Sequence, residues 1–342
     1  MKTNEAHETF RQIGFSDFVD VSGVKSIHHI VNTESKCGIY CLLVDDCLYY
    51  IGQSVNIATR FSDHRRRYQN IIQFSFVLCS EDKLDELEEY YIQTADAAGI
   101  KILNVQYASH PICKTDFDEL VPANEKIEWL NNEIEYSDEQ RKPESVENES
   151  IRVKGLNKYQ KLLTDPNHDF FVDVCAAYTF NMIPSPFKTE HNYWGVSCLP
   201  STARYERGYQ TIFCFNIYRI ETFVMLHRER TNEAWAYIVV AKSILIEEFG
   251  SEEAFLSAYP DCEFTGSTYQ NAGYDHITIG FLDLSKIYDR LSDWKIMRAA
   301  RVLNLRLMGK GRNFYKQYHS FQLADKIFEQ IEEWGETSGE AE

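Results

Sequence analysis

The sequence lacks several features that mark whole classes of protein. No run approaches the ~18 apolar residues needed to cross a bilayer, and the opening residues 1–5 lack the apolar segment of a secretory signal. No C-x-x-C pair occurs, and the nine cysteines are an odd number, which does not suit a disulfide framework. We therefore expect free thiols, a cytoplasmic location and no membrane partner.

Basic residues are few relative to acidic ones. The chain of 342 residues has 35 Lys and Arg against 52 Asp and Glu, a formal net charge of −17. A field of that sign repels phosphate, which disfavours a diffuse grip on nucleic acid. Any nucleic-acid site must then be a local basic patch.

Hydrophobic residues make up 44% of the chain, enough for more than one core, and no internal repeat is present. Between residues 114 and 149, twelve Asp and Glu stand against four Lys and Arg, together with Pro122 and Pro143. Such a segment is typical of a linker. We predict a first domain over 1–113, an acidic, partly helical linker over 114–150 and a second domain over 151–335.

The first domain alternates between strand-like and helix-like patterns. Apolar runs at 38–44, 48–51 and 71–78 predict a small antiparallel three-stranded sheet, and 56–67 and 81–98 predict flanking helices that Asn56 and Gly99 begin and end. In the second half, 207–226 predicts a strand, 235–249 a strand or a helix, and 285–307 a helix. The fold class is therefore α+β in both domains, with no family indicated for the second.

One carboxylate interrupts an apolar helix face. The apolar residues that share this face at a spacing of 3.6 residues are Leu84, Leu87, Tyr91, Ile92 and Ala95. Glu88 falls in the middle of them. Burying an unpaired charge costs several kcal/mol, so Glu88 must meet a cation, a hydrogen-bond donor or a metal ion, or lie at a solvated edge of the face.

The preceding helix carries the complementary charge. Arg60, His64 and Arg67 stand at i, i+4 and i+7 and so share one side of a helix. A guanidinium can bind phosphate with a fork of donors, and an imidazole can exchange a proton near neutral pH. A basic stripe is also typical of an ordinary solvated face.

The hairpin strands carry two further motifs that complete an ordered set. Along the chain, the set is Gly38-Ile39-Tyr40, Tyr50-Ile51-Gly52, Arg60, His64, Glu88 and Asn104. In order and spacing it resembles the GIY-YIG endonuclease superfamily over about residues 36–107. The resemblance implies a metal-dependent endonuclease that hydrolyses phosphodiester bonds in DNA, expected to be double-stranded. Similar arrangements occur in mobile-element, restriction and phage-defence nucleases.

The resemblance also implies a role for each residue. Glu88 would hold one Mg²⁺ or Mn²⁺, and Arg60 would neutralise charge on the phosphoryl oxygens. Tyr40 would act as general base or hydrogen-bond the attacking water, while Tyr50 and His64 would orient water or relay protons. Asn104 would be an orienting or structural group. A tyrosine has an ordinary pKa of ~10, so a catalytic base would need a nearby cation to lower it.

The two tyrosines impose a geometric condition on the hairpin. With a two-residue turn at Asp45-Asp46, Tyr40 would face Ile51, and the side chains of Tyr40 and Tyr50 would project to opposite sides. A three-residue loop or a β-bulge returns both to one side. We therefore predict an odd loop or a bulge.

A local basic patch is present near the C-terminus. Residues 294–324 contain no Asp or Glu, and aromatic residues are interleaved with the cations. With Arg67, the candidate DNA-binding residues are Lys295, Arg298, Arg301, Lys310, Arg312 and Lys316. Residues 309–312 suggest a basic flexible loop suited to phosphate. The alternative is a helix whose cations pair with the many carboxylates of the chain.

Other functions stay open at this stage. A DNA-binding or regulatory protein can retain a nuclease fold without catalysis, and a second domain that senses a ligand or protein can gate the nuclease. The acidic linker could also occupy the DNA-binding surface, and a homo-oligomer is equally compatible with the sequence.

Overall fold

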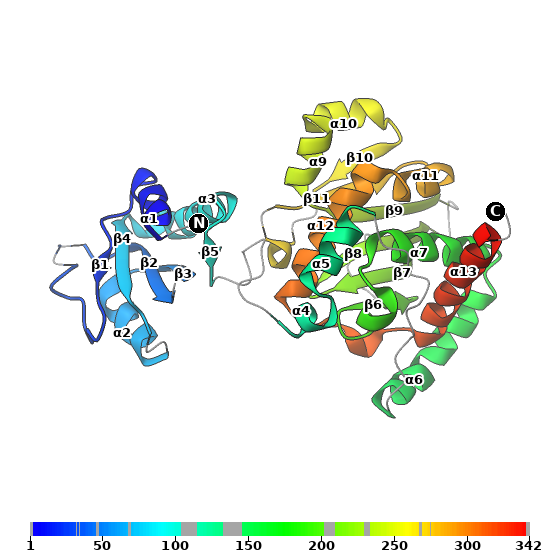
Figure 1. Cartoon of the computed structure of the whole chain (residues 1–342), viewed down its shortest axis with the longest axis horizontal. Coiled ribbons are helices and arrows are strands. Elements are labelled where there is room, and N and C mark those ends of the chain that lie inside the picture. The colour runs from blue at the N-terminus through cyan, green and yellow to red at the C-terminus, as the bar shows by residue number, and fades with distance from the viewer. Residues whose placement is uncertain are drawn as a thin grey trace. The chain divides into compact units, whose positions relative to one another are not determined.

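The computed structural model describes residues 3–31, 33, 35–45, 48–67, 70–103, 115–132, 146–201, 209–228, 233–266, 269–273 and 275–339. The chain is an α+β protein with two sheets (Figure 1). It divides into one unit of Met1–Cys113 and a second of Lys114–Glu342, so the first unit ends at the predicted residue. Among the described helices, none is both long and apolar enough to cross a membrane.

The first unit has a five-stranded sheet rather than the predicted three-stranded one. Its order is β1-β4-β2-β3-β5, and the central β4, β2 and β3 are antiparallel, as predicted. The bounds are β1 Val19–Asp20, β2 Gly38–Asp45, β3 Leu48–Ser54, β4 Gln73–Leu78 and β5 Lys101–Ile102. The sequence did not predict β1 and β5 because two residues are too few to show alternation. β5 runs parallel to β3.

Helices cover both faces of this sheet (Figure 1). α2 (Ile57–Arg67) lies on one face, and α1 (Thr3–Gln12) and α3 (Leu84–Ala97) lie on the other. Asn56 Oδ1 accepts a hydrogen bond from the Thr59 amide at 3.2 Å, which confirms the predicted cap of α2. α3 begins later than predicted because Glu81–Lys83 form a 3-10 turn, and Gly99 follows it with a φ of 74°.

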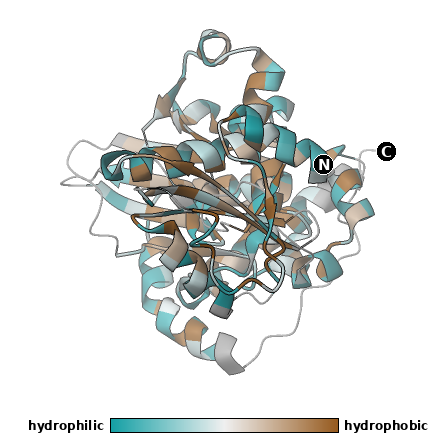
Figure 2. Ribbon diagram, turned by 90° about the vertical axis from the view of Figure 1, so that its left-hand side faces the viewer, coloured by the Kyte–Doolittle hydropathy of each residue, from teal (hydrophilic) through white to brown (hydrophobic). Residues whose placement is uncertain are grey.

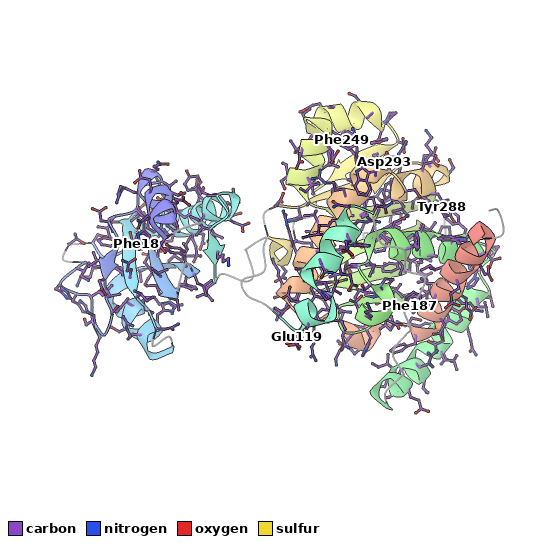
Figure 3. The ribbon with its side chains drawn as sticks, viewed as in Figure 1. Phe18, Glu119, Phe187, Phe249, Tyr288 and Asp293 are labelled. Carbon is purple, nitrogen blue, oxygen red and sulfur yellow. The ribbon has the colours of Figure 1, made fainter. Side chains whose placement is uncertain are left out.

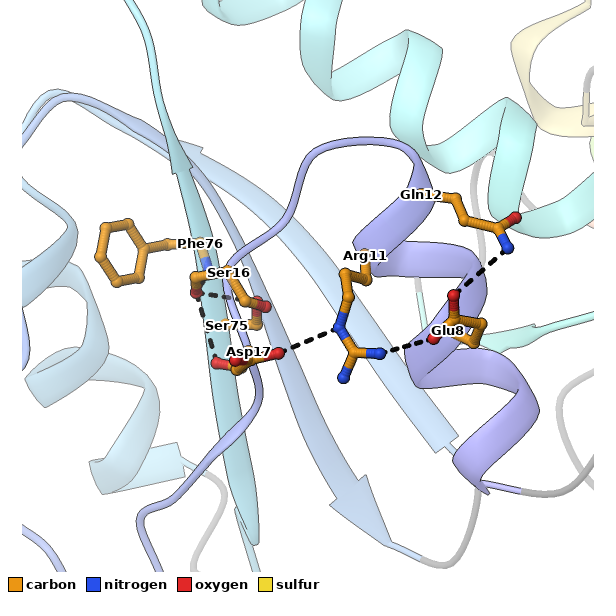
Figure 4. Close-up of polar contacts among 7 residues, drawn as sticks. All are labelled: Glu8, Arg11, Gln12, Ser16, Asp17, Ser75 and Phe76. Atoms are coloured by element: carbon orange, nitrogen blue, oxygen red, sulfur yellow. Dashed lines mark hydrogen bonds and ion pairs between the residues drawn. The ribbon is translucent and has the colours of Figure 1, made fainter.

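Polar contacts attach α1 to the sheet (Figure 4). The Ser16 amide donates to the Phe76 carbonyl at 3.0 Å, and the Phe76 amide donates to Ser16 Oγ at 3.1 Å. Arg11 of α1 pairs with Asp17 at 3.0 Å, just beyond this junction. The segment after α1 therefore runs along β4, and the backbone bonds hold it there more firmly than the exposed ion pair does.

The second unit contains a six-stranded antiparallel sheet of order β10-β11-β9-β8-β7-β6. Its strands are β6 Trp194–Cys198, β7 Tyr209–Ile217, β8 Ile220–Arg228, β9 Glu233–Val240, β10 Cys262–Thr265 and β11 Ile277–Phe281. Its α-helices are α4 Asp116–Leu120, α5 Ala123–Leu130, α6 Val146–Leu163, α7 His168–Met182, α8 Pro186–Thr189, α9 Lys242–Phe249, α10 Glu252–Ala258, α11 Ile287–Leu291, α12 Trp294–Lys310 and α13 Phe321–Gly339.

Aromatic side chains join the helices to the second sheet. The Tyr178 ring of α7 lies 4.7 Å from Phe215 and 4.8 Å from Phe223, and its hydroxyl donates to Thr222 Oγ1 at 3.0 Å. Trp194 of β6 packs edge-on against a ring of α13. In Figure 2 the strands in the middle of the view are largely brown and the helices mix brown with teal, as expected for amphipathic helices around buried sheets.

Three predicted elements of the second domain are corrected. The single helix predicted over 285–307 is two helices, because α11 ends at Leu291 and Asp293 caps the start of α12 at Trp294. The single strand predicted over 207–226 is a hairpin, in which β7 and β8 meet at a tight turn with Tyr218 at a φ of 55°. The stretch 235–249 is neither one strand nor one helix, since β9 ends at Val240 and α9 begins at Lys242. Polar residues are mixed among the apolar ones in the runs 207–226 and 235–249, so their periodicity did not reveal the breaks.

Part of the predicted linker belongs to the second unit. Phe117 of α4 and Val121 lie in its hydrophobic core, each 1% exposed, and Trp129 of α5 is buried as well. α6 begins at Val146 and also falls within this unit. The acidic composition of this segment led to the linker prediction although it contains these buried apolar residues. Residues 133–145 of the predicted linker lie outside the described residues.

We predict that Gly38→Ala destabilises the first unit by about 2–3 kcal/mol. A Cβ at this position would lie 2.1 Å from the Val77 carbonyl oxygen, so the backbone of β4 would have to move. Urea unfolding monitored by hydrogen exchange of β2 amides measures the loss. Gly266→Ala is the control, because no atom lies within 4 Å of its added Cβ; equal stabilities would contradict the close approach.

Candidate active site

The register of the hairpin brings the two tyrosines to one face. Tyr40 pairs with Gly52 and Leu42 pairs with Tyr50, and the register shifts between Leu43 and Asp45. The predicted bulge is therefore confirmed. The Tyr40 and Tyr50 ring centroids lie 6.1 Å apart, on the face that α2 covers.

Gly52 makes room for both rings. A Cβ on Gly52 would lie 2.6 Å from the Tyr40 hydroxyl oxygen and 2.8 Å from the Tyr50 ring. The residue lies inside β3, so its lack of a side chain serves packing rather than a turn. Ile39 and Ile51, the central residues of the two tripeptides, are completely buried.

His64 meets the tyrosines inside the unit. It is 5% exposed, and its Nε2 lies 2.6 Å from the Tyr40 hydroxyl oxygen. Its ring centroid lies 4.8 Å from that of Tyr50. The alternative of an ordinary solvated face therefore does not hold for His64, because α2 presents this position to the sheet.

Arg60 stands on the exposed side of the same cluster. Its guanidinium interacts with the Tyr40 hydroxyl, and its charge also acts on Tyr50. Burial raises the pKa of Tyr40 well above its ordinary value, with a further contribution from Tyr50, and the opposing effect of Arg60 is smaller. Tyr40 is consequently a neutral phenol at physiological pH, so Arg60 alone does not make it a phenolate base.

Glu88 is half-buried on α3, between the apolar residues of the predicted face. Gln53 Nε2 donates to Glu88 Oε2 at 3.1 Å and to Asp85 Oδ1 at 2.6 Å. Burial, with a contribution from Asp85, raises the pKa of Glu88, whereas Gln53 and the charge of Arg60 lower it. Glu88 and Arg60 therefore lie close enough for their charges to interact.

The side chains around Glu88 fit a single hard cation. Glu88 offers a partly desolvated carboxylate beside the carboxylate of Asp85, and carboxylate oxygens are ligands suited to Mg²⁺ or Mn²⁺. Among the described residues, no group of three or more His, Cys, Asp or Glu side chains forms a complete metal cage. A cation at Glu88 would thus keep most of its water ligands or bind phosphate.

Gln53 and Asp85 were not predicted as site residues. Gln53 follows Gly52 directly, and Asp85 precedes Glu88 by three positions on the same helix. That helical spacing was the one signal in the sequence that could have identified Asp85. Gln53 gave no signal, because polar residues occur at many strand positions. Asn104 and the side chain of Arg67 lie outside the described residues.

One cation of the basic patch of the second unit is internal. Arg301 is 3% exposed, and its guanidinium donates to the carbonyls of Asn181 and Trp129, both at 2.6 Å. This contradicts its assignment to a DNA-binding surface. α5 and the C-terminal end of α7 cover the face of α12 on which Arg301 lies.

Lys295 and Arg298 are tied to α9. The Lys295 ammonium donates to the Glu248 carbonyl at 3.2 Å and lies over the ring of Phe249, which Figure 3 labels. Arg298 pairs with Glu247 at 3.2 Å and with Glu248. These contacts agree with the alternative that the cations of this helix pair with carboxylates of the chain.

The last three candidates lie at the C-terminal end of the patch. The predicted flexible loop is partly helical, since α12 includes Lys310, whose ammonium donates to the Asn271 carbonyl at 3.0 Å. Gly311 ends the helix at a φ of 150°. Arg312 is exposed and pairs with Asp116 at 2.7 Å, and Lys316 begins a short 3-10 turn.

No protein-family model matches the chain, and no curated protein and no solved structure matches it either. The case for a function therefore depends on the residues of the site.

We predict that the affinity of the full chain for Mn²⁺ increases with pH. A protonated Glu88 does not bind a cation, and its raised pKa keeps it protonated to a higher pH than an ordinary glutamate. Affinity should increase about tenfold per pH unit below that pKa and level off above it. Isothermal titration calorimetry at a series of pH values measures this.

Glu88→Gln should abolish the binding, and Glu86→Gln, on the exposed side of α3, should leave it intact. Equal Mn²⁺ affinities for the two variants would rule out Glu88 as the ligand.

Proposed function

We propose that the protein is a metal-dependent DNA endonuclease of the GIY-YIG superfamily. The observation that carries the proposal is the buried contact of 2.6 Å between the Tyr40 hydroxyl and His64 Nε2, with Arg60 on the same hydroxyl. A hydrogen-bonded phenol and imidazole beside an exposed guanidinium can accept a proton and bind a phosphate at one place. Glu88 lies within range of the charge of Arg60, which supports a cation site next to that phosphate.

The pKa of Tyr40 favours a relay over direct base catalysis. A phenol that is neutral at physiological pH can take a proton from water only as it gives its own away. In the proposed step, the water oxygen attacks phosphorus and the P–O bond to the leaving oxygen breaks. The water proton passes to the Tyr40 oxygen while the Tyr40 proton passes to His64 Nε2.

Arg60 acts on the phosphate in this proposal. Its fork of donors binds the non-bridging oxygens, on which negative charge grows during the reaction, and its exposed position leaves it accessible to a large substrate. Tyr50, whose ring centroid lies 6.1 Å from that of Tyr40 and 4.8 Å from that of His64, orients the attacking water. A divalent cation held by Glu88 would supply the positive charge that stabilises the departing oxygen.

We predict that Arg60→Ala and Glu88→Ala each lower the rate of plasmid cleavage by about 100-fold or more, since each removes a group that stabilises charge in the transition state. Supercoiled plasmid is incubated with the full chain and Mg²⁺ or Mn²⁺, and nicked and linear products are quantified on gels.

Lys83→Ala and Glu86→Ala are matched controls of the same charges at exposed positions near α3, and they should cleave like the unmodified chain. Equal nicking by all five proteins would defeat the assignment. DNA binding by all five without any cleavage would instead indicate a regulatory protein that retains the nuclease fold.

A further inference from the structure

Two large aromatic side chains of the second unit, four positions apart in sequence, are exposed to solvent. Phe314 is 58% exposed and Tyr318 is 63% exposed, and both follow α12 in the acid-free stretch. Exposed aromatic rings are costly in water, and a pair of them in one loop indicates a contact surface.

The loop that carries these rings is firmly anchored. The Phe314 amide donates to the Tyr218 carbonyl at 2.7 Å, at the turn between β7 and β8. On either side, the Asn313 and Ser320 amides donate to the carbonyls of Asn192 and Val196, both at 2.7 Å. The rings are therefore held in the solvent by a fixed backbone and need little ordering on binding.

A cation lies on this surface. Arg219, at the same turn, is exposed, and its guanidinium carbon lies 4.9 Å from the centroid of the Phe314 ring and 5.7 Å from that of Tyr218. The tight turn between β7 and β8 therefore places Arg219 over Phe314, which is nearly a hundred positions later in the chain. We call the group formed by Tyr218, Arg219 and Phe314, together with Tyr318 four positions after Phe314 in the same loop, the aromatic platform.

The charges beside the platform favour an anionic partner. Arg312 and Lys316 flank Phe314 in the chain, and residues 294–324 contain no carboxylate. Asp116 pairs with Arg312, but the two side chains are 73% and 65% exposed, so solvent weakens this pair. In a chain of formal net charge −17, a segment whose sequence contains cations and no carboxylate is suited to phosphate.

We infer that the aromatic platform binds single-stranded DNA by stacking on unpaired bases, with Arg219 positioned for the adjacent phosphate. Every base has a π-face, so exposed rings bind single strands with little sequence preference, and a flanking cation follows the backbone. Bases within an intact duplex are already stacked on both faces, so the exposed rings cannot stack on them. The inference rests on the proposed function, since it takes DNA as the substrate, and it adds that the substrate presents unpaired bases to the second unit.

The test is binding of the full chain to fluorescent DNA without divalent metal, so that no cleavage occurs. Fluorescence anisotropy gives the Kd for a 20-nucleotide single strand and for the matched duplex at several salt concentrations. Phe314→Ala combined with Tyr318→Ala should raise the Kd for the single strand about 10- to 100-fold and that for the duplex less than threefold. The salt dependence should not change, because stacking releases no counterions.

Arg219→Ala should weaken binding and also reduce the slope of log Kd against log salt by about one. Phe180→Ala is the control, since it removes an exposed aromatic ring of the same unit on α7 and should leave both values unchanged. Circular dichroism and urea unfolding establish that each variant is folded.

An unchanged Kd for the folded double variant, or equal losses for single strand and duplex, would overturn the platform and leave the nuclease proposal standing. Selective loss of single-strand affinity in a chain that cleaves no DNA with metal would support the platform and overturn the nuclease. A full chain that binds neither DNA would overturn the platform.

Discussion

The hydrogen bond between the Tyr40 hydroxyl and the His64 imidazole is the contact on which the rest of the candidate site depends. It joins β2 to α2 in the interior of the first unit, where both side chains are almost completely buried. A buried polar pair of this kind is stable only when both partners stay together, because separating them leaves two desolvated groups. The pair therefore fixes the position of Arg60, which lies one turn earlier on the same helix.

Two backbone features make this contact possible. The bulge near the end of β2 turns both tyrosines to the α2 face, and Gly52 leaves the space in which the Tyr40 hydroxyl lies. Burial has a chemical consequence as well, since it raises the pKa of both Tyr40 and Glu88. Tyr40 is then better suited to passing a proton on than to holding a negative charge, and Glu88 holds its negative charge more readily when a cation lies beside it.

In the second unit, similar residues have different roles according to what covers them. Arg301 and Lys295 belong to one helix, yet one binds buried carbonyls and the other lies over a ring of α9. The cations that stay near the surface follow the end of α12, beside exposed aromatic rings. If both proposals are correct, one unit carries the chemistry of cleavage and the other holds the strand.

The sequence by itself determined the local elements whose pattern is short-ranged. The central strands, the Asn56 cap, the end of α3 at Gly99 and the need for a bulge all follow from alternation, capping and side-chain direction. The α+β class follows in the same way, and helical spacing placed Glu88 among apolar residues while leaving open whether it is buried. These are properties of neighbouring residues, so one chain segment contains the information.

Tertiary structure alone decided which polar groups meet. From its helical spacing alone, His64 could lie on a solvated face, but the sheet covers it. Arg301 was predicted to lie on an exposed basic patch, but α5 covers it. Phe117 belongs to the hydrophobic core although the segment around it is acidic. Gln53 joined the site because β3 passes beside α3, and Arg219 met Phe314 because a hairpin turn passes beside a distant loop. Whether a side chain is buried, and which polar group it contacts, depends on segments far apart in sequence. The periodicity within one segment contains no information about those contacts.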